Sequence, residues 1–189
     1  MEWQRFITHT DLYGGMTRMG AALRRASRTP ATYQLRVESC KVAAMSVGIE
    51  VVRAISDEVT RAITRLLPQL SQSAKPFDED ALRELVAWKC NRLLVARVDG
   101  EIMGALMLVM FPIPTGMRAW IEDVVVDEAA RGRGIGAALT QEAVRLARAD
   151  GARTVDLTSR PSREAANRLY ERLGFELRDS KVYRLTNVL

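Results

Sequence analysis

Histidine and cysteine are scarce in this chain of 189 residues, which holds one histidine, His9, and two cysteines, Cys40 and Cys90. Two cysteines are too few for a disulfide framework or a four-thiolate zinc site. We expect His9 to lie in an N-terminal tail, so the folded part has no imidazole for Ser-His-Asp or Cys-His catalysis or for binding a metal. Proton transfer would have to use carboxylates, Tyr, Cys, Lys or water, and we expect no metal site.

Long hydrophobic runs are also missing. The longest apolar stretch, residues 102–114, is interrupted by Gly104 and Pro112. It is shorter than the roughly 18 consecutive apolar residues of a membrane span. No apolar segment of a secretory signal follows the basic residues near the N-terminus. We therefore expect a cytoplasmic protein that does not act in a membrane.

The excess of positive charge is confined to the N-terminal part of the chain. Residues 1–46 carry seven basic and three acidic side chains, whereas the other 143 residues carry 21 basic and 20 acidic ones. A nearly neutral body lacks the basic surface of a DNA-binding protein, so we expect no nucleic-acid partner. Residues 1–46 show no clear periodicity. We expect a disordered extension, or a true start at Met45, and the alternative is an arginine-rich transit peptide.

From Gly48 onward, hydrophobic periodicity and turn residues predict regular structure. Asp99-Gly100 between two apolar runs predicts a tight hairpin. The predicted helices are 57–70, 78–89, 135–149 and 163–173. The predicted strands are 49–55, 93–98, 102–110, 119–126, 154–158, 175–177 and 182–185. This order, with no internal repeat, predicts one α/β (α+β) domain over residues 47–189, with a mixed central sheet and helices on both faces.

The glycine-rich segment Arg131-Gly132-Arg133-Gly134-Ile135-Gly136 lies between a predicted strand and a predicted helix. Glycines let backbone N–H groups approach a ligand, and the helix N-terminus and two arginines favour a phosphate. A P-loop would need a lysine here, and Ala137 replaces the third glycine of a Rossmann turn. A methyltransferase-type turn also matches, but too little chain follows it for a doubly wound fold. A helix start without a ligand stays open as the alternative.

Two linked motifs resemble the GNAT family of N-acetyltransferases. The first is Val124-Val125-Val126-Asp127 followed by Arg131-x-x-Gly134-x-Gly136, and the second is Leu169-Tyr170-Glu171-Arg172-Leu173-Gly174-Phe175. The resemblance covers residues 48–187 and implies the GNAT acyl-CoA-binding fold, with acetyl-CoA as co-substrate. It implies that the pantetheine arm pairs with one strand and that the pyrophosphate lies on the amides of 132–137. The residues expected at the cofactor are Val124, Val126, Arg131, Gly132, Arg133, Gly134, Ile135, Gly136, Ala137 and Asn167.

Glu122 is the expected general base for acetyl transfer, because an amine must lose a proton before it attacks the thioester. Strand alternation would place Glu122, Val124 and Val126 on one face and Asp123 on the other. Residues 121–126 are also similar to the strand of glucosamine-6-phosphate N-acetyltransferases that holds an acidic residue near the amine. Asp123 or water as the base, and a merely solvated Glu122, stay open as alternatives.

Tyr170 is the expected general acid, by its position in the second motif, and a tyrosine that only packs on the sheet is the alternative. Many family members have Asn seven positions before this Tyr, where this chain has Arg163. Asn167, one helical turn before Tyr170, is the nearest substitute for that cofactor contact. We interpret Cys90 as a buried structural thiol and not as a nucleophile.

The predicted function is transfer of an acetyl group from acetyl-CoA to a primary amine by direct attack in a ternary complex. The acceptor would be an amine-bearing small molecule or a peptide, and we consider a homodimer as the assembly. The alternative is a catalytically silent GNAT-like module that binds acyl-CoA as a sensor or a partner domain. Fold alone does not decide between them.

Overall fold

The computed structural model describes residues 47–71 and 78–186. The predicted disordered extension, residues 1–46, lies outside them, so it stays a prediction. None of the described helices has the length and hydropathy of a membrane-spanning helix. In chain order the elements are β1 (Gly48–Val51), α1 (Asp57–Leu70), α2 (Glu79–Ala87), β2 (Asn91–Val98), β3 (Glu101–Ile113), β4 (Gly116–Val126), the 3-10 helix η1 (Glu128–Ala130), α3 (Ile135–Ala149), β5 (Thr154–Leu157) and α4 (Glu164–Arg172).

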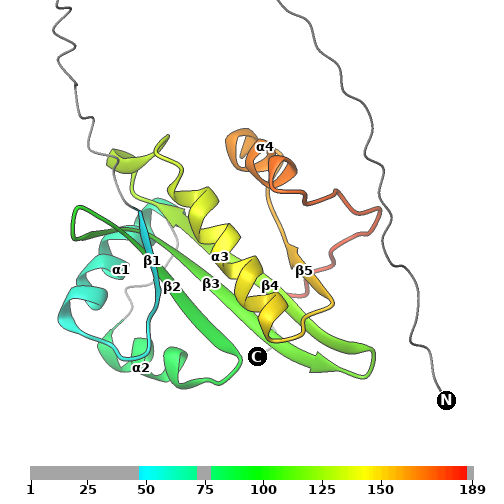
Figure 1. Ribbon diagram of the computed structural model, residues 1–189, viewed down its shortest axis with the longest axis horizontal. Helices are drawn as coiled ribbons and strands as arrows, with labels where there is room; N and C mark the ends of the chain where they lie inside the picture. The colour runs from blue at the N-terminus through cyan, green and yellow to red at the C-terminus, as the bar shows by residue number, and fades with distance from the viewer. Residues whose placement is uncertain (1–46, 72–77, 187–189) are drawn as a thin grey trace, which may run out of the picture. The chain divides into compact units, whose positions relative to one another are not determined.

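A five-stranded sheet in the order β1-β2-β3-β4-β5 forms the centre of the domain. The first four strands are antiparallel neighbours, and β5 joins β4 in parallel after the crossover through α3. Figure 1 shows α3 lying across the sheet, with α1 and α2 near the β1 and β2 side. Two apolar clusters fill the two faces: α3 packs on one, and α1 and α2 pack on the other. The predicted mixed sheet with helices on both faces is confirmed.

Local sequence signals explain where the helices begin. Ser56 and Asp78 cap α1 and α2 by accepting hydrogen bonds from backbone N–H groups three residues later. On the predicted apolar face of α1, Val59, Ile63 and Leu66 are buried, and Leu67 and Leu70 are partly buried. The predicted hairpin between β2 and β3 is present, with positive φ at both Asp99 and Gly100.

Two predicted strands at the C-terminal end are wrong. No strand or helix forms in the described residues after α4, although 175–177 and 182–185 have strand-like apolar patterns. A strand needs a partner for its backbone groups, and these segments are paired with no strand of the described chain. Phe175 still packs on the core cluster, but the later apolar side chains are exposed, namely Leu177, Val182, Tyr183 and Leu185. The first strand is also shorter than predicted, because β1 ends at Val51.

Candidate active site

The edge between β4 and β5 opens partway along β4. The parallel pairing runs from Arg118 with Thr154 to Ile121 with Leu157 and then stops. β4 continues to Val126, so its last five residues have β3 as a neighbour on one side and, within residues 47–71 and 78–186, no strand on the other. Backbone groups along this free edge are available to an extended ligand, as at any unpaired strand edge.

A bulge interrupts β4 at the start of this free edge. Ala105 pairs with Val125 but Met107 pairs with Glu122, so two residues on β4, 123 and 124, lie opposite one residue on β3. Asp123 within the bulge has a φ of 51°, in the left-handed region. Aspartate is among the few residues other than glycine that tolerate this region.

The bulge makes the predicted alternation wrong. Val124 and Val126 pack against the cluster beneath α3, whereas Val125 belongs to the cluster beneath α1 and α2. Glu122 pairs with Met107, which also packs on the α1 and α2 side. Because residues paired across strands share a face, Glu122 lies on the opposite face from Val124 and Val126. One extra residue in the strand reverses every later side chain.

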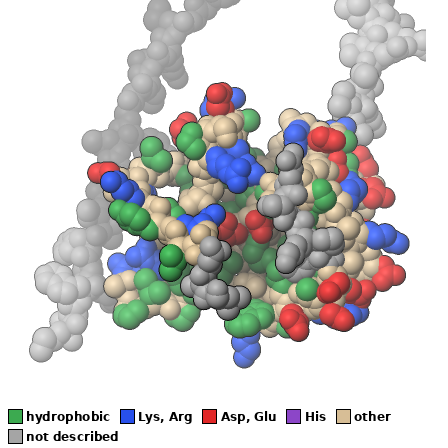
Figure 2. All heavy atoms as spheres, turned by 180° about the vertical axis from the view of Figure 1, so that it is seen from behind, with side chains coloured by type: hydrophobic (Ala, Val, Ile, Leu, Met, Phe, Trp, Pro, Cys, Tyr) green, Lys and Arg blue, Asp and Glu red, His purple; other side chains and the backbone are tan. Residues whose placement is uncertain are grey.

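Both candidate bases, Glu122 and Asp123, are exposed to solvent. The Glu122 carboxylate accepts a hydrogen bond of 2.6 Å from the indole N–H of Trp120. Figure 2 shows acidic side chains near the middle of one face of the molecule, among basic and hydrophobic ones. The structure therefore keeps both carboxylates accessible where β4 leaves β5, and it leaves the choice between them as a prediction.

The glycine turn before α3 is open and has no side chain capping it. Gly132 and Gly134 have φ of 79° and 78°, and a Cβ added to either would meet nothing within 4 Å. Gly134 is the N-cap of α3. No side chain caps the N–H groups at the start of α3, and the first turn of this helix holds no acidic residue. By contrast, α1 and α2 each have a capping side chain and two acids in their first turns. The N-terminus of α3 therefore offers unpaired donors and the positive end of the helix dipole to an anion.

A cavity of about 580 Å³ lies beside this turn. Ligand pockets typically measure about 300–1,000 Å³. Its wall combines the free end of β4, the C-terminal end of α1 and the start of α4, with Arg131 and Arg163 contributing positive charge. The lining residues are Gln69, Leu70, Val124, Val125, Val126, Arg131, Ser162, Arg163, Glu164, Ala165, Ala166 and Arg168. The predicted Val124, Val126 and Arg131 thus meet in one cavity.

Arg163 and Asn167 occupy different places at the start of α4. Arg163 lines the cavity and donates a hydrogen bond of 3.2 Å from Nη2 to the carbonyl of Leu70 at the end of α1. The amide of Asn167 donates to the carbonyls of Arg160 and Pro161, at 3.1 and 3.4 Å. Asn167 thereby shapes the turn before α4 and does not line the cavity, so its predicted cofactor contact has no support in this geometry.

Tyr170 is half-buried on α4, with its ring set edge-on against Phe175 at 5.9 Å between centroids. Burial raises the pKa of its phenol, and the positive charge of Arg163 opposes this in part. A phenol with a raised pKa stays protonated throughout the neutral range. Tyr170 is therefore protonated at neutral pH and able to donate a proton, but it is a weaker acid than a solvated tyrosine.

Cys90 is only half-buried, contrary to the prediction of a buried thiol. It lies in the connection between α2 and β2, where Sγ contacts Asn91 Oδ1 at 3.6 Å. It is not among the residues that line the cavity beside the glycine turn. That Cys90 is not a nucleophile stays a prediction.

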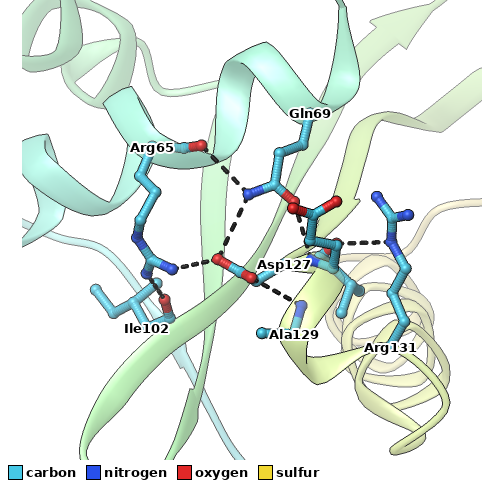
Figure 3. Close-up of polar contacts among 8 residues, drawn as sticks. Arg65, Gln69, Ile102, Asp127, Ala129 and Arg131 are labelled. Atoms are coloured by element: carbon cyan, nitrogen blue, oxygen red, sulfur yellow. Dashed lines mark hydrogen bonds and ion pairs between the residues drawn. The ribbon is translucent and has the colours of Figure 1, made fainter.

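Sequence reasoning missed a polar network behind the cavity, which Figure 3 shows in detail. Asp127, directly after β4, is buried and forms an ion pair with Arg65 of α1. Gln69, one turn further along α1, also reaches Asp127. Arg65 and Gln69 are four residues apart on one helix face, but nothing local in the sequence connects them to Asp127.

Comparisons with known proteins bear on the family and the fold. The family model described as "Acetyltransferase (GNAT) family" matches residues 59–175. Glucosamine 6-phosphate N-acetyltransferase 1 of Oryza sativa subsp. japonica is 33% identical over 128 residues, 62% of this chain and 75% of that protein. Mycothiol acetyltransferase of Beutenbergia cavernae is 35% identical over 106 residues, 55% of this chain and 35% of that protein. A crystal structure of a transcriptional regulator from Bacillus halodurans C-125 is 30% identical with a TM-score of 0.63, covering 74% of this chain and 99% of that one.

Proposed function

We propose a function for this chain from its membership of the acetyltransferase (GNAT) family. It transfers the acetyl group of acetyl-CoA to a primary amine by direct attack in a ternary complex. One observation carries the proposal: β4 separates from β5 after Ile121 and leads to the uncapped N-terminus of α3. An extended thioester arm fits the open strand edge, and its diphosphate fits the helix end. CoA is the kind of donor that combines both parts.

The proposed donor site follows this arrangement. The pantetheine arm would lie along the backbone of Val124 and Val126, and the pyrophosphate would accept hydrogen bonds from the N–H groups of 132–137. Arg131 lines the same cavity and, with Arg133, adds positive charge. Its Nε donates to the carbonyl of Val126 at 3.4 Å, which keeps the guanidinium near the end of β4.

The proposed reaction begins with loss of a proton from the acceptor ammonium. Glu122 lies on the other face from Val124 and Val126, so we propose that it receives this proton through a water molecule. The neutral amine then attacks the thioester carbonyl carbon and forms a tetrahedral intermediate. Collapse of this intermediate breaks the C–S bond, and the nitrogen gives its remaining extra proton to water, which yields the neutral amide and the CoA thiolate. Asp123, exposed beside Glu122, is the second candidate for the base.

The CoA thiolate then takes a proton, which we propose comes from the Tyr170 hydroxyl. Reference pKa values near 8.5 for a thiol and near 10 for a phenol already make this transfer uphill by about 2 kcal/mol. Burial raises the pKa of Tyr170 further. We therefore propose a moderate contribution from Tyr170, about 10–100-fold in rate, with water able to replace it.

The proposed acceptor is an amine-bearing small molecule or a peptide. The relative from Oryza sativa carries the name glucosamine 6-phosphate N-acetyltransferase, which makes a phosphorylated amino sugar the first compound to test. The test is release of free thiol from acetyl-CoA by the full chain with a panel of amino sugars, small amines and peptides. Stoichiometric thiol release and acetylated amine with one class would support the proposal. Binding of acetyl-CoA without thiol release for any acceptor would favour a silent binding module.

We also propose a homodimer. Its support is the exposed apolar segment after α4, in which Leu177, Val182, Tyr183 and Leu185 face solvent, together with the outer edge of β5, which pairs with β4 only on its other side. A second copy could cover this surface, because an apolar extended segment and a free strand edge complement each other. Light scattering should give twice the chain mass for the full protein. A mass of one chain at micromolar concentration would refute the dimer.

A further inference from the structure

We propose that Arg65 and Gln69 of α1 are positioning residues that hold the turn at 127–134 in the shape that binds a diphosphate. The inference rests on the proposed function, since the diphosphate is that of the CoA donor. Figure 3 shows Arg65 and Gln69 projecting from α1 toward Asp127, at the start of this turn.

Asp127 is the centre of the network. The residue is 5% exposed, and Asp127 and Thr140 are the only buried polar residues among those that the structure describes. One carboxylate oxygen, Oδ1, accepts the N–H of Ala129 at 3.0 Å, which closes the first turn after β4. The other, Oδ2, faces α1 and pairs with Arg65. A buried carboxylate needs such partners, so the position of Asp127 depends on α1.

Arg65 ties the turn to the neighbouring strand. While Nη1 pairs with Asp127, Nη2 donates a hydrogen bond of 2.6 Å to the carbonyl of Ile102 in β3. The backbone N–H of Asp127 donates to the carbonyl of Met103 at 2.8 Å. The planar guanidinium makes both contacts in one fixed orientation, which a lysine could not do.

Gln69 holds the turn with both ends of its amide. Oε1 accepts the backbone N–H of Glu128 at 2.9 Å, and Nε2 lies 3.5 Å from Asp127 Oδ2. Gln69 also lines the cavity, as does Arg131, which lies later in the same turn. It therefore links α1 to the part of the backbone that leads directly into the diphosphate site.

The glycine part of the turn needs support from outside because its own residues supply little. Gly132 and Gly134 both have positive φ and no side chain to pack, and no side chain caps α3. Glycine has the largest backbone freedom to lose on ordering. Contacts from α1 at 127 and 128 reduce that freedom before the donor binds, and preorganisation of this kind strengthens binding.

The test compares Gln69→Leu and Arg65→Ala with Arg61→Ala, a control that removes an exposed arginine one turn earlier on α1. Affinity for CoA is measured by calorimetry with each full chain. We expect Kd to rise about tenfold in Gln69→Leu and in Arg65→Ala, which is about 1.4 kcal/mol. We expect no change in Arg61→Ala, and a binding stoichiometry of one per chain in all variants.

A second ligand separates positioning from a general structural defect. Pantetheine lacks the diphosphate, and amide NMR measures its Kd even where binding is weak. If α1 positions the diphosphate turn, Arg65→Ala should bind pantetheine as the wild type does, because Arg65 is not among the residues that line the cavity. An equal loss for CoA and pantetheine, or an unchanged Kd for CoA, would overturn the inference while leaving the proposed function intact. Failure of the wild type to bind CoA would overturn both.

Discussion

Replacing Gly134 by Asp and by Asn separates charge from backbone strain in the diphosphate site. Gly134 has a φ of 78°, which costs an ordinary residue about 1–2 kcal/mol but costs Asn and Asp less. A Cβ at this position meets nothing within 4 Å, so neither side chain is blocked sterically. The two variants therefore have similar backbone cost and similar volume, and they differ by one negative charge.

That charge should change affinity and stability in opposite directions. A carboxylate about 4 Å from one phosphate charge is repelled by about 1 kcal/mol in water and about 4 kcal/mol at an effective dielectric constant of 20. Gly134 is exposed, so the lower part of that range applies, and CoA should bind Gly134→Asp about 5–30-fold more weakly than Gly134→Asn. At the same position a negative charge favours the N-terminus of α3 by about 0.3–1 kcal/mol. The Asp variant should therefore unfold at an equal or higher temperature than the Asn variant.

Calorimetric titration with CoA at 0.05 M and 1 M salt, beside thermal unfolding without ligand, is the assay. The difference in Kd between the two variants should shrink at 1 M salt, where the Debye length falls to about 3 Å. Equal affinity of Gly134→Asp and Gly134→Asn at low salt would refute the reasoning, because no anion would then lie at the helix end. Weaker binding accompanied by loss of stability only in the Asp variant would also contradict it.

Three other predictions follow from the proposed roles of these residues. The loss of kcat/KM in Glu122→Gln should be largest below the pKa of the amine and vanish above it, whereas the loss in Tyr170→Phe should persist as pH rises. Profiles of kcat/KM against pH in which both variants show equal, pH-independent losses would refute both roles. Burial raises the pKa of Tyr170, so the contribution of Tyr170 to stability is complete below pH 10 and is lost as pH rises through the folded pKa. Between pH 8 and 11, the free energy of unfolding measured in urea should therefore fall less in Tyr170→Phe than in the wild type. The same dependence of this free energy on pH in both proteins would contradict the prediction. A chain that starts at Met45 should keep the melting temperature and activity of the full chain, and a large loss of either would show that residues 1–46 contribute to the domain.

The glycine turn could be predicted from the sequence because its signal is local. The spacing of Gly132, Gly134 and Gly136 at a helix start is the physical requirement for backbone contact with an anion. The structure adds the missing cap and the absence of acids in the first turn of α3. Both features could also have been read from residues 134–138, which hold no Asp, Glu, Ser or Thr.

The face of Glu122 could not be predicted, because alternation assumes an uninterrupted strand. Nothing in residues 121–126 marks a bulge except Asp123, and Asp occurs in regular strands as well as at positive φ. The contacts of Asp127 with Arg65 join positions 62 residues apart, so no periodicity or motif could reveal them. The C-terminal apolar pattern predicted strands, but a pattern specifies only a preference, and a strand also requires a partner edge.

The most direct test of the account is a crystal structure of the full chain with CoA. The account predicts the diphosphate within hydrogen-bond distance of the N–H groups of 132–137, and the pantetheine arm along β4 where β5 has separated from it. Asp127 should keep its contacts with α1 in that complex. CoA bound elsewhere on the domain, or a diphosphate that contacts only side chains and leaves the amides at the start of α3 free, would contradict the central claim.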